Sequence, residues 1–166
     1  MKTILLLLLP ITLMSQQQKT ITKSIVDVNG FEKITAEALK HRESRMIPID
    51  KFLEYAKDPN TIVLDTRSES AYRAKHLKGA IHINFSEFTE DKLAKLIDSK
   101  NTRILIYCNN NIKGDQINFA TKKAPLALNI PTYINLYGYG YKNVYELSSL
   151  IKINDKRWEF VSSESK

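Results

Sequence analysis

The stretch "ILIYCNNNIKGD", Ile104 to Asp115, decides the fold class of this chain. It begins with four residues suited to a buried strand and continues with the only cysteine, three asparagines and a glycine. A second run, "TIVLD" from Thr61 to Asp65, is also β-branched and lacks polar alternation. Strands covered on both faces have this pattern. Both runs end in a chemically useful residue, Asp65 in one and Cys108 in the other.

Helix signals alternate with these strand signals along most of the chain. Turn residues, capping residues and apolar periodicity predict the boundaries of each element. The expected helices are one that Asp58-Pro59 ends, one that opens at Ser68 or Ser70, one within 86–98, and one capped by Asn129 with Pro131 inside, ending at Gly138 or Gly140. The expected further strands are 79–85 and 143–147, the latter as the last strand.

This alternation predicts an α/β fold with a mainly parallel central sheet. In such sheets, ligands bind beyond the carboxyl ends of the strands. Because Asp65 and Cys108 both stand at that end, the sequence predicts a site there.

The ends of the chain differ from this domain in composition. Residues 1–15 have the form of a secretory signal peptide, because two charged or polar residues precede an apolar run too short to cross a bilayer. We therefore expect an exported protein, periplasmic or secreted, without a stable membrane anchor; the alternative is a cytosolic protein with a frayed apolar N-terminus. Residues 16–45 are polar and contain one weakly helical stretch, from Ile34 to Arg42. We expect them to form either a mobile leader or a helix on the surface of the domain. The domain follows at 46–150, and Trp158 docks a tail at 151–166.

Charge and cysteine content exclude several classes of function. The formal charge of +7 is spread along the chain among carboxylates, which favours a diffusely cationic surface over a nucleic-acid groove. The three histidines lack the spacing of a zinc site, and no metal or other cofactor is expected. Cys108 has no partner in the chain for a disulfide.

Three motifs in order resemble those of the rhodanese-like domains. The stretch from Ile62 to Ile83 resembles the first signature, with Asp65 and Arg67 at a strand end and His76, Leu77, Gly79 and Ala80 in the following turn. The run into Cys108 resembles the strand before the family's sulfur-carrying cysteine. "GYKNVYEL" (140–147) resembles a later strand.

The resemblance implies a three-layer fold and a sulfurtransferase reaction. Cys108 would take a sulfane sulfur from a small anionic donor such as thiosulfate and pass it to a nucleophilic acceptor, with Asp65 and Arg67 in support. The thiol would have to ionise near neutral pH. Backbone amides of the following loop, meeting a helix N-terminus, could stabilise that anion. The expected loop consists of Asn109, Asn110, Asn111, Ile112, Lys113 and Gly114.

The chain departs from the family after the cysteine. The next defensible helix starts near Pro131, so the connection is unusually long for a compact domain. Either part of it forms a short helix with Phe119, Ala120 and Leu126, or a lid covers the site. Gly114 occupies the place where phosphatases of this fold need an arginine, which argues against phosphoryl chemistry.

Two other functions remain open. One is a catalytically silent rhodanese-like module that binds a partner protein through the lengthened loop. The other is a thiol-redox protein, which the lack of a second, resolving cysteine disfavours.

Overall fold

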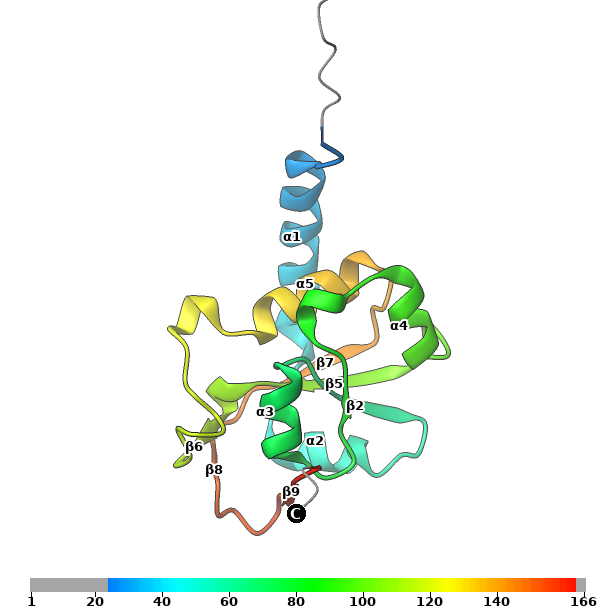
Figure 1. Ribbon diagram of the computed structural model, residues 1–166. Coiled ribbons are helices and arrows are strands. Elements are labelled where there is room, and N and C mark those ends of the chain that lie inside the picture. Colours follow the sequence, from blue (N-terminus) through cyan, green and yellow to red (C-terminus); the bar gives the residue numbers. More distant parts are fainter. Residues whose placement is uncertain (1–23, 164–166) are drawn as a thin grey trace, which may run out of the picture.

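The computed structural model describes residues 24–163 and contains a five-stranded parallel sheet in the order β1-β7-β5-β2-β4 (Figure 1). Every pair of neighbours in this sheet is parallel, as predicted. The strands are β1 (Met46–Ile47), β2 (Thr61–Asp65), β4 (Ile81–His82), β5 (Arg103–Tyr107) and β7 (Val144–Leu147). The proposed signal peptide lies outside the described residues and stays a prediction. Among residues 24–163, no helix is long and apolar enough to cross a membrane.

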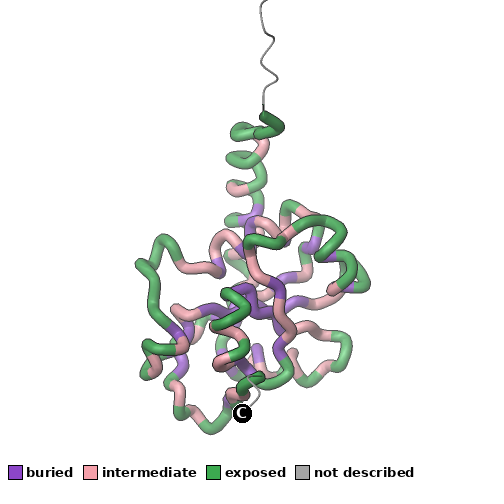
Figure 2. The backbone as a smooth tube through the Cα atoms, viewed as in Figure 1, coloured by how far each residue is buried: buried purple, intermediate pink, exposed green. Residues whose placement is uncertain are grey.

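Helices cover both faces of the sheet and give three layers. On one face, α2 (Ile49–Ala56) and α3 (Glu69–Ala74) pack over alternate residues of the central strands. On the other face lie α1 (Val28–Arg42), α4 (Glu90–Leu96) and α5 (Asn129–Gly138). Figure 2 shows the buried residues concentrated along the sheet between these layers. The fold is therefore α/β with three layers, as the sequence resemblance implies.

The central strand β5 is apolar on both faces, as a strand between two layers of helices must be. Strand β5 pairs with β2 over its full length, from Thr61–Arg103 to Asp65–Tyr107, and with β7 on its other edge. Residues 104 to 107 are buried almost completely because both faces of β5 are covered. An apolar run without polar alternation is the sequence counterpart of this burial.

The helix α5 ends as its sequence predicts. The backbone amide of Gly140 donates to the carbonyl of Tyr137, and that of Tyr141 donates to Leu136, which together form a Schellman cap. Gly140 has a φ of 88°, a conformation that residues with a side chain rarely adopt.

The start of α5 differs from the prediction. Leu128, and not Asn129, is the N-cap, and Asn129 is the first residue of the helix. Its side chain is buried and donates to Asn111 and Glu146. The prediction was wrong because asparagine favours caps in general, whereas here buried acceptors beside the helix engage its amide.

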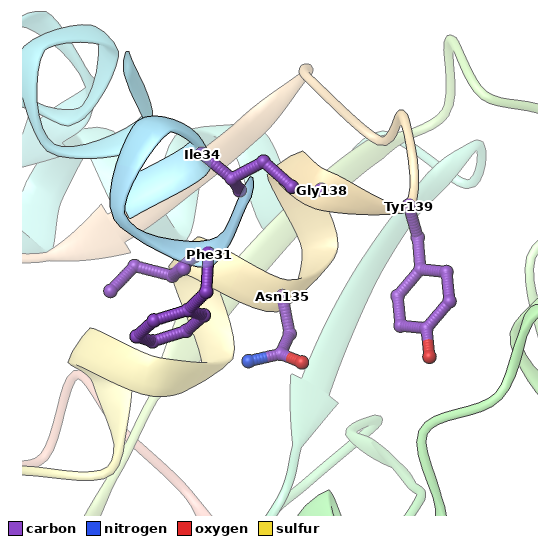
Figure 3. A pocket seen from close by; sticks show the side chains of 6 residues that line it. Phe31, Ile34, Asn135, Gly138 and Tyr139 are labelled. Carbon is purple, nitrogen blue, oxygen red and sulfur yellow. The ribbon is translucent and has the colours of Figure 1, made fainter. Parts of the chain in front are cut away.

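The leader contributes a longer helix than expected. The predicted segment 34–42 is the second half of α1, which begins at Val28 after an Asp27 N-cap and packs against α5. The approach is close, because a Cβ at Gly138 would lie 3.3 Å from Cγ2 of Ile34. Beside this contact, α1 and α5 line an apolar pocket of about 220 Å³ (Figure 3).

The connection between Cys108 and α5 contains short turns and one short strand. It comprises η3 (Asn109–Asn111), β6 (Ile112–Lys113), a turn at 116–119 and η4 (Ala124–Leu126). Phe119 is fully buried, whereas Leu126 is exposed, so the two residues do not share an inward helix face. We call residues 114–128 the excursion.

The strand β7 is the last strand of the main sheet but not of the chain. The two-residue strands β8 (Ile151–Lys152) and β9 (Phe160–Val161) follow it. β8 pairs with β6, and β9 pairs with β3 (His76–Leu77). The expectation that 143–147 would be the last strand was wrong because the C-terminal segment adds strands to elements outside the main sheet.

The prediction that Trp158 anchors the tail is confirmed. Its indole is 4% exposed and lies against the rings of Phe52, Tyr107 and Phe160. The tail is thus part of the core on the α2 side of the sheet.

We expect Trp158→Ala to lower the free energy of unfolding by about 3–5 kcal/mol, because a large buried side chain is lost and a cavity remains. Trp158→Phe is the matched control. It keeps an aromatic ring and removes an indole N–H that has no hydrogen-bond partner in the described part of the chain, so it should cost clearly less. Urea unfolding curves check both values; equal losses would contradict the packing role.

Candidate active site

The site is built where β5 ends. Cys108 follows Tyr107 in extended conformation, with φ −146° and ψ −174°. Its amide donates to Oδ1 of Asn111 at 2.9 Å, and the Asn111 amide donates back to the Cys108 carbonyl at 3.0 Å. These two bonds close η3 into a tight turn directly behind the thiol.

The backbone amides of three residues lie near the sulfur of Cys108 and favour its anion. One belongs to Asn110 in η3, and the other two belong to Leu128 and Asn129 at the N-terminus of α5. The predicted loop therefore supplies only part of the cradle, and a segment about twenty residues further along the chain completes it. The positive end of the helix dipole adds to the attraction for an anion at this point.

The thiol is nevertheless more buried than expected. Cys108 is 1% exposed and forms no disulfide. Burial raises the pKa of the thiol, and the charge of Glu146 adds to this rise, while the three amides lower it without reversing it. The expectation of a thiol that ionises near neutral pH was wrong, because the sulfur is buried and the nearby amides do not outweigh that burial.

A pocket of about 300 Å³ lies beside the thiol. Residues adjacent to Cys108 line it, namely Asn109 and Leu128, together with Thr66 and Arg67 after β2 and Lys122 of the excursion. The side-chain oxygen of Asn109 is buried and has no hydrogen-bond partner in the described part of the chain. The lining thus presents positively charged and polar residues to a small polar molecule.

Asp65 and Arg67 lie on the face of the sheet opposite Cys108. Side chains alternate along a strand, so Tyr107 and Cys108 point to opposite faces, and Asp65 is the partner of Tyr107 across the sheet. Arg67 Nη2 donates to Asp65 Oδ2 at 2.6 Å, as does the Tyr107 hydroxyl. Both charged residues are almost fully buried.

The guanidinium of Arg67 also holds the excursion. It donates to the carbonyls of Asn118 and Lys75 at 3.0 and 2.7 Å and stacks 4.4 Å from the ring centre of Phe119. Burial alone would lower the pKa of Arg67, but the hydrogen bond and charge of Asp65 outweigh it and raise the pKa. The geometry therefore gives this pair a supporting position, without contact with the thiol.

The other residues of the predicted loop either contact the excursion or belong to the strand β6 and the turn after it. Asn110 and Lys122 exchange two hydrogen bonds, side-chain amide to backbone, at 2.8 and 3.1 Å, which fixes the excursion over η3. Ile112 is buried in the core, and Lys113 pairs with Lys152 in β8. Neither they nor Gly114 line the pocket beside Cys108.

Sequence reasoning missed several residues around the thiol. Leu128, Lys122, Thr66 and Glu146 are separated from Cys108 by long stretches of chain, and only the fold brings them together. Glu146 did carry a signal, because a carboxylate at an inward position of the apolar strand 143–147 requires a buried partner.

We expect Arg67→Met to destabilise the protein by about 3–5 kcal/mol, because it leaves the Asp65 carboxylate buried without its cation. Arg73→Met is the matched control, since the Arg73–Glu69 pair is exposed and 3.8 Å apart. It should cost no more than about 0.5 kcal/mol. Thermal and urea unfolding measure the difference, and a loss of similar size in both variants would refute the assignment.

Comparison with known proteins agrees with this architecture. The family model described as "Rhodanese-like domain" matches residues 49–149. The tRNA uridine(34) hydroxylases of Legionella pneumophila strains Corby and Lens are each 33% identical over 70 residues, which cover 40% of this chain and 28% of each hydroxylase.

Two solved structures match part of the chain. The BH2092 protein from Bacillus halodurans is 26% identical with a TM-score of 0.47, covering 68% of this chain and 74% of that one. The Alr3790 protein from Anabaena sp. is 21% identical with a TM-score of 0.42, covering 61% and 68%. On the strength of the family match over most of its length, this chain belongs to the rhodanese-like domain family.

Proposed function

We propose that the protein is a sulfurtransferase of rhodanese type, with Cys108 as nucleophile and sulfur carrier. The donor is a small anion such as thiosulfate, and the acceptor is a small nucleophile or a partner protein. The observation that carries the proposal is the place of the Cys108 sulfur, at the carboxyl end of β5 and beside the backbone amides of Asn110 in η3 and of Leu128 and Asn129 at the N-terminus of α5. Such an arrangement favours an anion at the sulfur position, whether thiolate or persulfide.

The reaction has two steps. The Cys108 thiolate attacks the outer sulfur of thiosulfate, so that a new S–S bond forms at the cysteine and the bond to the sulfonate sulfur breaks, releasing sulfite. An acceptor such as cyanide then attacks the outer sulfur of the persulfide. Thiocyanate leaves, and the thiolate is restored.

The pocket beside the thiol supports a small donor. Lys122 supplies a positive charge, and the polar side chains of Thr66 and Asn109 supply hydrogen bonds. Because Cys108 is itself buried, the donor reaches the sulfur only when the residues that cover it move. We therefore expect slow loading with sulfur at neutral pH.

A second candidate is a silent binding module, and the burial of Cys108 favours it. A thiol that is 1% exposed and has a raised pKa is a poor nucleophile at neutral pH. In this case the excursion would contact a partner protein, and Cys108 would only fill space.

A thiosulfate–cyanide assay on the protein and on Cys108→Ser separates these candidates. We expect thiocyanate formation by the unaltered protein and its loss in the variant, because no other described residue is a thiol. Mass spectrometry after thiosulfate treatment should show the gain of one sulfur atom on Cys108. Equal activity in both proteins, or no sulfur adduct at any pH, would reject the sulfurtransferase.

The pH dependence of alkylation tests the buried thiol directly. Because the folded pKa is raised, Cys108 stays protonated over the pH range in which an exposed cysteine, with a pKa near ~8.5, ionises. The rate of reaction with iodoacetamide should therefore rise at higher pH in the folded protein than in urea. A folded midpoint below the unfolded one would contradict the burial that the structure shows.

A further inference from the structure

A buried carboxylate lies behind the active-site cysteine and is paired with a helix outside the family domain. Glu146 of β7 is 5% exposed. Arg42, the last residue of α1, donates two hydrogen bonds to the carboxylate of Glu146. One runs from Nε to Oε2 at 2.5 Å and the other from Nη2 to Oε1 at 2.7 Å. The family model begins at residue 49, so Arg42 comes from outside it.

A chain of hydrogen bonds leads from this pair to Cys108. Asn129 Nδ2 donates to Glu146 Oε1 at 3.2 Å and to Asn111 Oδ1 at 3.0 Å. The same Asn111 oxygen accepts a hydrogen bond from the backbone amide of Cys108, and the backbone amide of Asn129 lies near the Cys108 sulfur, where it favours the anion. One asparagine thus contacts both the carboxylate and the thiol.

The sheet register places Glu146 and Cys108 on the same face. Glu146 is the partner of Ile106, and side chains two residues apart along a strand share a face. The two groups are therefore diagonal neighbours under α5, at a separation across which charges interact. Beside Arg42 and Cys108, the titratable group facing Glu146 is Tyr133 of α5, whose hydroxyl bonds His41 and lies near Arg45.

We propose that Arg42 and Glu146 act as a positioning pair that sets how readily Cys108 becomes an anion. The Glu146 carboxylate opposes a negative charge on the sulfur, and the Arg42 guanidinium offsets that opposition. The docking of α1 on the domain therefore controls the reactivity of the thiol. The benefit to sulfur transfer rests on the proposed function, whereas the effect on the thiol does not.

The test compares the pH midpoint of Cys108 alkylation in Glu146→Gln, Arg42→Met and the double variant. Removing the carboxylate should move the midpoint to lower pH, and removing the guanidinium should move it to higher pH, each by on the order of one unit. The double variant should follow Glu146→Gln, because Arg42 acts through Glu146. The amide introduced by Glu146→Gln retains an oxygen that can accept from Asn129, so this variant is the one expected to keep the fold.

Lys40→Met is the matched control. Lys40 lies on the exposed face of the same helix. The Lys40→Met variant loses the same charge as Arg42→Met, so the pH midpoint of its Cys108 alkylation should equal that of the unaltered protein. An unchanged midpoint in Glu146→Gln, or a shift in Lys40→Met as large as in Arg42→Met, would overturn the inference. If Arg42→Met does not fold, the Glu146→Gln midpoint decides alone.

The same proteins distinguish failure of the inference from failure of the proposed function. Shifted midpoints without any sulfur adduct on Cys108 would support the pair and reject the sulfurtransferase. An adduct on Cys108 with unshifted midpoints would reject the pair and support the sulfurtransferase.

Discussion

The structure depends on the burial of β5 between two layers of helices. A strand covered on both faces must be apolar throughout, and its alternating side chains enter two separate cores. Where this strand ends, Tyr107 and Cys108 therefore point in opposite directions. The end of β5 thus places the Tyr107 hydroxyl with the Asp65–Arg67 pair on the α2 side of the sheet and the Cys108 thiol on the α5 side.

These two sides are coupled through the excursion. On the support side, the Asp65–Arg67 pair holds the carbonyl of Asn118, and on the thiol side Asn110 holds the backbone of Lys122. A long connection in a compact domain would otherwise cost conformational entropy and leave backbone groups without partners. Here polar contacts anchor its middle, at Asn118 and Lys122, and the backbone amide of its last residue, Leu128, lies near the sulfur.

The sequence was sufficient for the strands β2, β4, β5 and β7, for most of the helices and for the place of the cysteine. Their signals are local: apolar runs, a Schellman-type glycine, and Ser68, whose hydroxyl caps α3. The environment of the thiol was not predictable in the same way, because the groups around it come from η3, β7 and the start of α5, which are far apart in the sequence. Asn129 illustrates the difference, since its type suggested a cap while its surroundings made it a link between Glu146 and Asn111.

The strand β8, which pairs with β6, lies beyond the C-terminal limit of the family match. The matched residues end at 149, yet Ile151, Trp158 and Phe160 complete the core that also contains Ile112 and Phe119. An excised fragment cut at the family limits would therefore expose an apolar surface on the α2 side of the sheet, opposite Cys108. The region of sequence similarity is therefore shorter than the unit that folds.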